Sequence, residues 1–228
     1  MRFLGLLALL LAASADSLVF NSEQVKILNK AVDEARDLSQ IAVKALSVPR
    51  SERSATFEFL FGETTFLDHG WETPKKPKQR GKDVTEHSLV YACPSSEESF
   101  CKDPHTLAFV LTSGQWDGPT MVLMCPPFFQ DQTPIKSVIQ GWRDSEEIQP
   151  TINAGMTLLH EFQHIPKVTG RSNVCIDVPD PDNSEEACYS PDCCVRLSDD
   201  LKIRNAENYN LFAGAVMAWP ERAVPPSH

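Results

Sequence analysis

The chain of 228 residues lacks several features that mark common classes of protein. No segment reaches the eighteen consecutive apolar residues that a membrane-spanning helix needs, so we expect no membrane partner. Basic residues are scarce: 21 Lys and Arg stand against 31 Asp and Glu, and the formal net charge of −10 argues against nucleic acid as a partner. There is also no Asn-x-Ser/Thr sequon, so N-glycosylation is not expected.

The first fifteen residues predict a secretory signal peptide. Arg2 supplies a positive charge, Phe3 to Ala12 form a short apolar run, and Ala13-Ser14-Ala15 fits the small-x-small cleavage pattern. We therefore expect a secreted, extracellular protein in which residues 16–228 form a single domain with a substantial core.

Seven cysteines in a secreted chain predict disulfide bonds, and their odd number leaves a thiol that is free or pairs with another molecule. Cys93 and Cys101 are the easiest local pair, and the connectivity of the others stays open. A second zinc site built from the cluster between Cys188 and Cys194 is an alternative, but an oxidising compartment favours disulfides there.

The predicted elements follow the order helix, strands, helices, which is the α+β pattern. The clearest helix spans residues 21–47, where apolar side chains recur every three or four residues and Asn21 with Gln24 can form a capping box. Residues 55–62 are compatible with a strand or a helix. Three strand-like runs and two later helices complete the pattern: 88–93, 106–112 and 121–125, then a helix around His160 and one at about 205–218.

The most informative motif is His160-Glu161-x-x-His164, within the largely apolar segment Met156–Ile165. On a helix, residues four apart lie on one face, so both imidazoles can bind one metal ion. Glu161 lies beside that face, where its carboxylate can take a proton from water without being a ligand. This arrangement is typical of zinc peptidases. The apolar surroundings argue against a surface helix with two unrelated histidines, because buried imidazoles without partners are costly.

A catalytic zinc site needs a third protein ligand. The extended motif H-E-x-x-H-x-x-G-x-x-H would require Gly at position 167 and His at position 170, but these positions are Lys167 and Gly170. The metzincin pattern is therefore excluded, and the third ligand lies elsewhere in the chain.

Three pieces of the second half of the chain resemble the deuterolysin-like metalloendopeptidases, or aspzincins, which are secreted mainly by fungi. They match the family's zinc helix with its early proline, the strand end before that helix, and the closing helix: His160–Pro166, Cys125–Phe129 and Asn205–Ala213. The resemblance implies a zincin-like α+β metallopeptidase domain with a helical core, a small antiparallel sheet and disulfides. It also implies one catalytic Zn²⁺ and protein or peptide substrates, and we expect a monomer.

In that family the third ligand is an Asp with a Tyr three residues later, inside a Gly-Thr-x-Asp-x-x-Tyr-Gly block that this chain does not keep. Two mappings stay open. Asp177 is favoured because it keeps the residue type and lies 13 residues after His164, close to the family's distance; Glu186 instead keeps the spacing of three to Tyr189. The resemblance implies that Tyr189 donates a hydrogen bond to the oxyanion of the reaction.

Together these features predict a secreted zinc-dependent endopeptidase with His160, His164 and Asp177 as metal ligands and Glu161 as general base. One alternative is a non-catalytic secreted zinc-binding protein on the same scaffold, against which Glu161 argues because zinc binding alone needs no base. Another is a gluzincin-type peptidase, in which Glu186 or Glu207 is the third ligand.

Overall fold

The computed structural model describes most of the chain, in the following ranges: 20–46, 54–62, 90–94, 99–112, 120–130, 133–150, 153–169 and 174–220. The predicted signal peptide at residues 1–15 lies outside these ranges. The chain divides into two compact units: Met1–Lys30 with Arg80–Gln132, and Ala31–Gln79 with Thr133–His228. A single domain over residues 16–228 stays a prediction.

Helix α2 (Ser22–Leu46) begins in the first unit and ends in the second. Its predicted capping box is confirmed. Asn21 Oδ1 accepts hydrogen bonds from the backbone N–H groups of Glu23 and Gln24, at 3.0 and 2.9 Å, and Gln24 Oε1 accepts from the N–H of Asn21 at 2.9 Å. These contacts satisfy backbone donors that the first turn of a helix leaves without partners.

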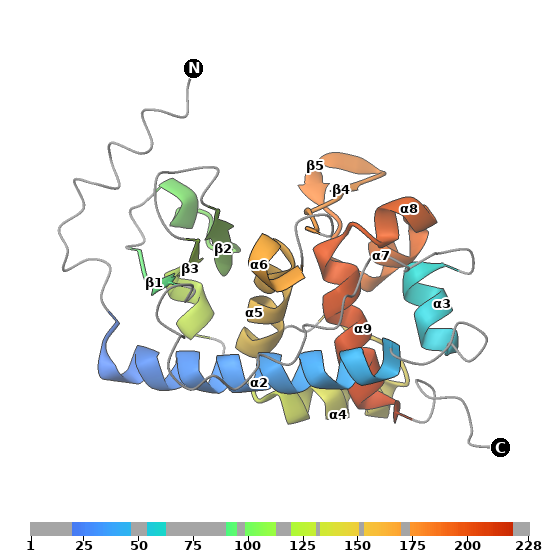
Figure 1. Ribbon diagram of the computed structural model, residues 1–228, viewed down its shortest axis with the longest axis horizontal. Helices are drawn as coiled ribbons and strands as arrows, with labels where there is room; N and C mark the ends of the chain where they lie inside the picture. The colour runs from blue at the N-terminus through green and yellow to red at the C-terminus, as the bar shows by residue number, and fades with distance from the viewer. Residues whose placement is uncertain are drawn as a thin grey trace. The chain divides into compact units, whose positions relative to one another are not determined.

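The first unit contains a small sheet (Figure 1). Its strands are β1 (Val90–Ala92), β2 (Ala108–Leu111) and β3 (Met121–Met124), in the spatial order β1-β3-β2. β2 and β3 are antiparallel as predicted, but β1 and β3 are parallel, so the predicted antiparallel sheet is in fact mixed. The reason is that β3 lies between two strands that precede it in the chain and run in opposite directions.

The predicted pair Cys93–Cys101 is wrong, because Cys101 forms a disulfide with Cys125. Cys101 ends the short helix η3 (Ser99–Cys101), and Cys125 lies between β3 and the short helix η4 (Pro126–Phe129). The Cys125 N–H donates to the carbonyl oxygen of Leu107, just before β2, so the pairing of β2 with β3 carries Cys125 back toward η3. The disulfide partner of Cys101 is therefore set by proximity in the folded sheet and not by proximity in the sequence.

The second unit is mainly helical (Figure 1). Besides the end of α2 it contains these elements: α3 (Ala55–Phe61), α4 (Ile135–Ser145), α5 (Ala154–Gln163), α6 (Pro166–Thr169), β4 (Pro179–Asp180), β5 (Asn183–Ala187), α7 (Pro191–Arg196), α8 (Asp199–Lys202) and α9 (Ala206–Ala218). Helix α9 is the central element and packs against α3, α4, α5 and α7. Eleven of its residues from Ala206 to Val216 are buried, as expected of a helix surrounded by others.

Close packing between α4 and α9 depends on Gly214. A Cβ atom at this position would lie 2.6 Å from the ring of Trp142, which is fully buried on α4. No side chain larger than hydrogen fits there without moving the indole. The ring therefore fixes the distance between the two helices.

Residues 55–61, which the sequence leaves open between strand and helix, form helix α3. Ser54 caps it by accepting from the N–H of Phe57, and Phe57, Leu60 and Phe61 are buried on one side. Helix α4 and the β4–β5 hairpin were not predicted. α4 follows Pro134 without a side-chain cap and contains Gly141, so its local signals are weak.

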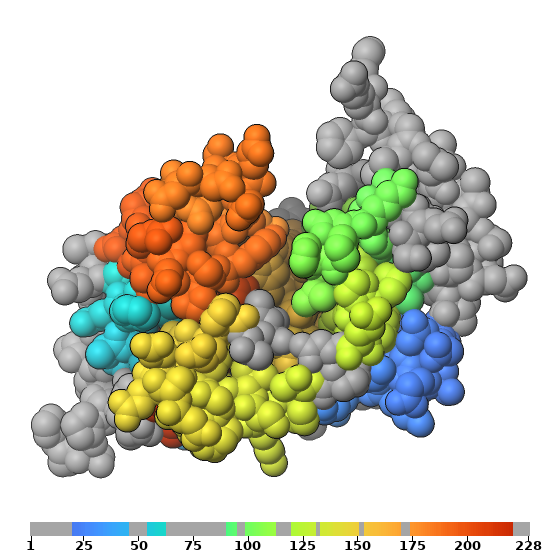
Figure 2. Space-filling view, turned by 180° about the vertical axis from the view of Figure 1, so that it is seen from behind, coloured from blue at the N-terminus to red at the C-terminus, as the bar shows by residue number. Residues whose placement is uncertain are grey.

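The α+β class with a helical core, a small sheet and disulfides is confirmed. Figure 2 shows the second unit from behind, where α7, in orange, lies next to α3, in cyan. Within the described ranges, no helix combines the length and the apolar character that crossing a bilayer requires.

Candidate metal centre

Helix α5 contains His160 and has His164 as its C-cap residue, and its start is fixed by Asn153. Asn153 Oδ1 accepts from the N–H of Met156 at 2.9 Å, which is an N-cap. Its Nδ2 donates to Glu34 Oε2 at 2.7 Å and to the carbonyl oxygen of Thr133 at 3.2 Å. The cap thus ties α5 to α2 and to the segment before α4, so the helix cannot easily rotate about its axis.

The two imidazoles lie one turn apart on the same face of α5, with Nε2 of His160 and Nε2 of His164 only 3.3 Å from each other. Each Nδ1 faces an acceptor: Glu207 Oε2 lies 2.8 Å from Nδ1 of His160, and the carbonyl oxygen of Cys175 lies 3.0 Å from Nδ1 of His164. Because carboxylate and carbonyl oxygens accept hydrogen bonds, we assign a proton to Nδ1 of both rings. Nε2 of each ring is then the nitrogen that a metal ion can bind, in place of any proton that it carries.

Asp177 reaches the histidines because its segment is attached on both sides. The N–H of Cys175 donates to the carbonyl oxygen of Gln163 at the end of α5, at 3.0 Å. Ile176 forms a parallel bridge with Asn205 at the start of α9. The N–H of Val178 donates to Asn205 Oδ1 at 3.2 Å. These bonds place Asp177 between the two helices, facing α5.

His160, His164 and Asp177 form a group with potential ligand atoms close enough for one ion. Asp177 Oδ1 lies 3.0 Å from His160 Nε2 and 3.4 Å from His164 Nε2. Tetrahedral zinc at about 2.0–2.1 Å from each ligand requires ligand atoms about 3.3 Å apart. The three observed separations, 3.0, 3.3 and 3.4 Å, fit that requirement.

The side chains of this group lie so close together that each one shifts the pKa of the others. Burial alone would lower the pKa of His160, but hydrogen bonds to Asp177 and Glu207 outweigh it and raise the pKa to about 10. Burial alone would raise the pKa of Asp177, yet the hydrogen bonds from His160 and His164 hold it well below its usual range. Two imidazoles and an ionised carboxylate thus compete for protons, as donor sets for divalent cations do.

Glu161 lies outside the group of potential ligands but next to it. It is 6% exposed, and burial raises its pKa, with the charges of His160 and His164 acting in the opposite direction. A raised pKa makes a carboxylate a better proton acceptor near neutral pH. Glu161 is thus a buried carboxylate with a raised pKa at the position where the motif predicts a general base.

Tyr189 lies at the same site, with its ring centroid 5.6 Å from that of His160. Burial raises the pKa of its hydroxyl, and Asp177 raises it further, so the hydroxyl stays protonated and can donate. The neighbouring disulfide Cys188–Cys193 and the hydrogen bond from the Cys188 N–H to the carbonyl oxygen of Val178 hold this residue beside the Asp177 segment. Glu186 is exposed on β5 and does not belong to the group.

The alternative of a second zinc site near Cys188 is wrong, because Cys188 and Cys193 form a disulfide. Cys93, Cys175 and Cys194 are buried and lie outside the two disulfides, whereas the odd count required at least one cysteine outside such bonds. Burial raises the pKa of Cys175 to about 12 and raises that of Cys194 as well. Both therefore remain neutral thiols, which are poor metal ligands.

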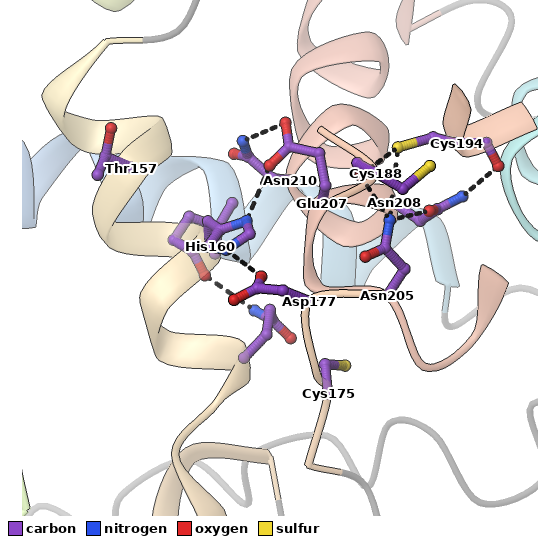
Figure 3. Close-up of polar contacts among 12 residues, drawn as sticks. Thr157, His160, Cys175, Asp177, Cys188, Cys194, Asn205, Glu207, Asn208 and Asn210 are labelled. Atoms are coloured by element: carbon purple, nitrogen blue, oxygen red, sulfur yellow. Dashed lines mark hydrogen bonds and ion pairs between the residues drawn. The ribbon is translucent and has the colours of Figure 1, made fainter. Parts of the chain in front are cut away.

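Four polar residues at the start of α9 also support the site: Asn205, Glu207, Asn208 and Asn210. They are at most 1% exposed, and Figure 3 shows Glu207 between Asn210 and His160, with Asn205 and Asn208 in contact with each other. Their support was not predicted, although a polar run inside an otherwise apolar helix is a visible signal. Hydrogen bonds satisfy most of these buried groups, although Asn210 Oδ1 has no hydrogen-bond partner among the described residues.

Neither the scan of protein families nor the search of curated proteins produced a match. Among solved structures, the chain is similar to a zinc peptidase from Grifola frondosa, with a TM-score of 0.49 and 15% sequence identity over 88% of this chain and 99% of that one. A similarity of this size does not extend to the roles of individual residues.

Proposed function

We propose that the protein is a secreted zinc-dependent endopeptidase of the deuterolysin-like type. The observation that carries the proposal is the mutual distance of 3.0–3.4 Å between three ligand atoms, His160 Nε2, His164 Nε2 and Asp177 Oδ1. A buried glutamate with raised pKa directly follows the first ligand in the chain. Protein or peptide substrates, one zinc ion and a monomeric state belong to the same proposal.

His160, His164 and Asp177 would hold the ion, and the fit of their separations to tetrahedral zinc supports this choice. When bound, zinc supplies Lewis acidity, which makes water a stronger acid and stabilises negative charge on a carbonyl oxygen. Three protein ligands leave a fourth position for water or substrate, as catalytic sites require.

Glu161 would accept a proton from the attacking water at its carboxylate oxygen and pass it to the nitrogen of the leaving amine. Burial raises its pKa, which favours both steps, because the carboxylate then accepts a proton readily and the protonated form remains a usable acid. The carboxylate thus acts twice in one hydrolysis, first as base and then as acid.

Tyr189 would donate a hydrogen bond to the carbonyl oxygen as it acquires negative charge. Its protonated hydroxyl and its position against His160 support this role. About half of the side chain is exposed, so a substrate can reach it.

The test measures zinc content and cleavage of casein by the secreted protein and by Glu161→Ala. We expect about one zinc per chain in both, and cleavage by the first alone, because Glu161 moves protons and does not hold the ion. Glu185→Ala, which removes an exposed carboxylate on β5, is the matched control and should cleave like the unsubstituted protein.

Zinc bound without cleavage by the unsubstituted protein would favour the alternative, a non-catalytic zinc-binding protein on the same scaffold. Absence of zinc from the unsubstituted protein, after loading with excess Zn²⁺, would contradict both.

A further inference from the structure

Glu207 is a buried carboxylate that the proposed reaction does not use. It lies on the first turn of α9 and is 1% exposed. An ionised carboxylate in such a position is costly unless charged or hydrogen-bonding groups satisfy its oxygens. The groups that contact the two oxygens of Glu207 therefore explain how this carboxylate can be buried.

Both oxygens of Glu207 have defined partners. Oε2 lies 2.8 Å from Nδ1 of His160, and Oε1 accepts from Nδ2 of Asn210 at 3.1 Å (Figure 3). Asn210 lies three residues further along α9 and is fully buried. The amide thus fixes the rotation of the carboxylate, and the carboxylate fixes the ring of His160.

The contact is made on the edge of the imidazole that faces away from Asp177. Nδ1 faces Glu207, whereas Nε2 lies 3.0 Å from Asp177 Oδ1. Glu207 is accordingly outside the group of potential ligands, which disfavours the gluzincin-type alternative with Glu207 as third ligand.

His160 and His164 differ in the group that accepts the hydrogen bond from Nδ1. His164 donates to a neutral backbone carbonyl, that of Cys175, and His160 donates to a carboxylate. A carboxylate acceptor both fixes the Nδ1–H tautomer and increases the electron density available at Nε2. His160 is therefore the ligand whose orientation and basicity depend most on a side chain.

We propose that Glu207, held by Asn210, is a positioning residue that sets the affinity of the centre for a divalent cation through His160. The inference rests on the proposed function, because it assumes that His160 is a metal ligand. Glu207 would touch neither the ion nor the substrate; it acts by holding the proton of His160 on Nδ1 and by directing Nε2 toward the ligand group.

The test measures the dissociation constant of the full chain for Zn²⁺, with no other ligand present. The protein is first stripped of metal, and binding is then measured by competition with a chromophoric chelator. Glu207→Ala should weaken zinc binding about 10- to 100-fold, the usual effect of losing such an outer partner. Glu207→Gln keeps the shape and an acceptor oxygen but loses the charge, so it should weaken binding less, by about 3- to 10-fold.

Gly214→Ala provides the matched control, because it perturbs the packing of α9 against Trp142 and Met156, while Gly214 takes part in none of the hydrogen bonds of His160. It should lower the Tm of the metal-free protein while zinc affinity stays within about twofold. A general loosening of α9 would instead weaken zinc binding in this variant as well, and that result would overturn the inference.

Zinc affinities of the unsubstituted protein and of the Glu207 variants distinguish failure of the inference from failure of the proposed function. Zinc bound by the unsubstituted protein and by both Glu207 variants with affinities within about twofold would overturn the inference alone. If Glu207→Ala does not fold, an unchanged affinity in Glu207→Gln overturns it equally. No zinc bound by the unsubstituted protein would remove the proposed function and this inference with it.

Discussion

At the scale of single residues, the candidate centre depends on one carboxylate brought to two imidazoles. Asp177 Oδ1 is within 3.4 Å of both Nε2 atoms, while Glu186 is exposed on the hairpin. Both residues remained open as third ligand in the sequence. The distances favour Asp177.

Replacement of Asp177 by Asn should therefore weaken zinc binding by more than about 100-fold, beyond the loss caused by an outer partner. Glu186→Gln is the matched control and should bind zinc like the unsubstituted protein. Isothermal titration calorimetry measures both. The opposite pattern, with binding lost in Glu186→Gln and kept in Asp177→Asn, would establish the other mapping.

The raised pKa of His160 predicts how zinc binding depends on pH. With a pKa of about 10, the ring is protonated at neutral pH in the metal-free protein, and zinc must displace that proton. Asp177 stays ionised in this range because its pKa is lowered. Zinc affinity should therefore rise with pH between 6 and 8, by about tenfold per unit for each proton displaced.

Calorimetry in buffers with different ionisation enthalpies measures the number of protons released on zinc binding. We expect at least one. An affinity that does not change with pH, together with no proton release, would show that both imidazoles are already neutral in the metal-free protein.

At the scale of elements, the start of α9 holds the segment that carries Asp177. Asn205 is fully buried; its Oδ1 accepts from the N–H of Val178, and its Nδ2 donates to the carbonyl oxygen of Cys188 at 3.1 Å and to Asn208 Oδ1 at 2.8 Å. One side chain thus connects α9 to the residues on both sides of the β4–β5 hairpin. The start of α9 therefore fixes the position of the segment that carries Asp177, the proposed third ligand.

Asn205→Ala should lower the free energy of unfolding by about 2–3 kcal/mol, because it leaves buried donors and acceptors without partners. It should also weaken zinc binding by about tenfold, since the Asp177 segment loses an attachment. Urea denaturation and chelator competition measure the two effects. Asn183→Ala, an exposed change on β5, should alter stability by less than about 0.5 kcal/mol. Full zinc affinity in a destabilised Asn205→Ala would show that the remaining bonds suffice.

At the scale of the whole molecule, all residues of the candidate centre belong to the second compact unit, and the disulfide Cys101–Cys125 belongs to the first. This disulfide joins residues 24 apart in sequence, and closing such a loop stabilises a fold by about 3 kcal/mol.

Replacement of both Cys101 and Cys125 by Ser should therefore lower stability by about 3 kcal/mol and leave zinc affinity unchanged. Thermal unfolding with and without zinc, together with the zinc titration, distinguishes the two effects. A loss of affinity of more than about threefold would show that the first unit contributes to the centre.

Local patterns were enough to predict several parts of this protein. The capping box at Asn21 and Gln24 was predicted because its hydrogen bonds span only three residues. The position of His160 beside His164 followed from the helical repeat, which places residues four apart on one face. Helix α4 was missed because its start has no side-chain cap, so its stability comes from burying Trp142 against α9.

The sequence by itself therefore determined the α+β order of elements and the placing of His160 and His164 on one face, because both depend on short-range periodicity. Tertiary structure alone decided the partner of Cys101, the approach of Asp177 and the contact of Glu207 with His160. In each of these cases the two residues are 17 to 47 positions apart. Contacts at such separations form only where sheet register and helix packing bring distant segments together, and no local pattern encodes them.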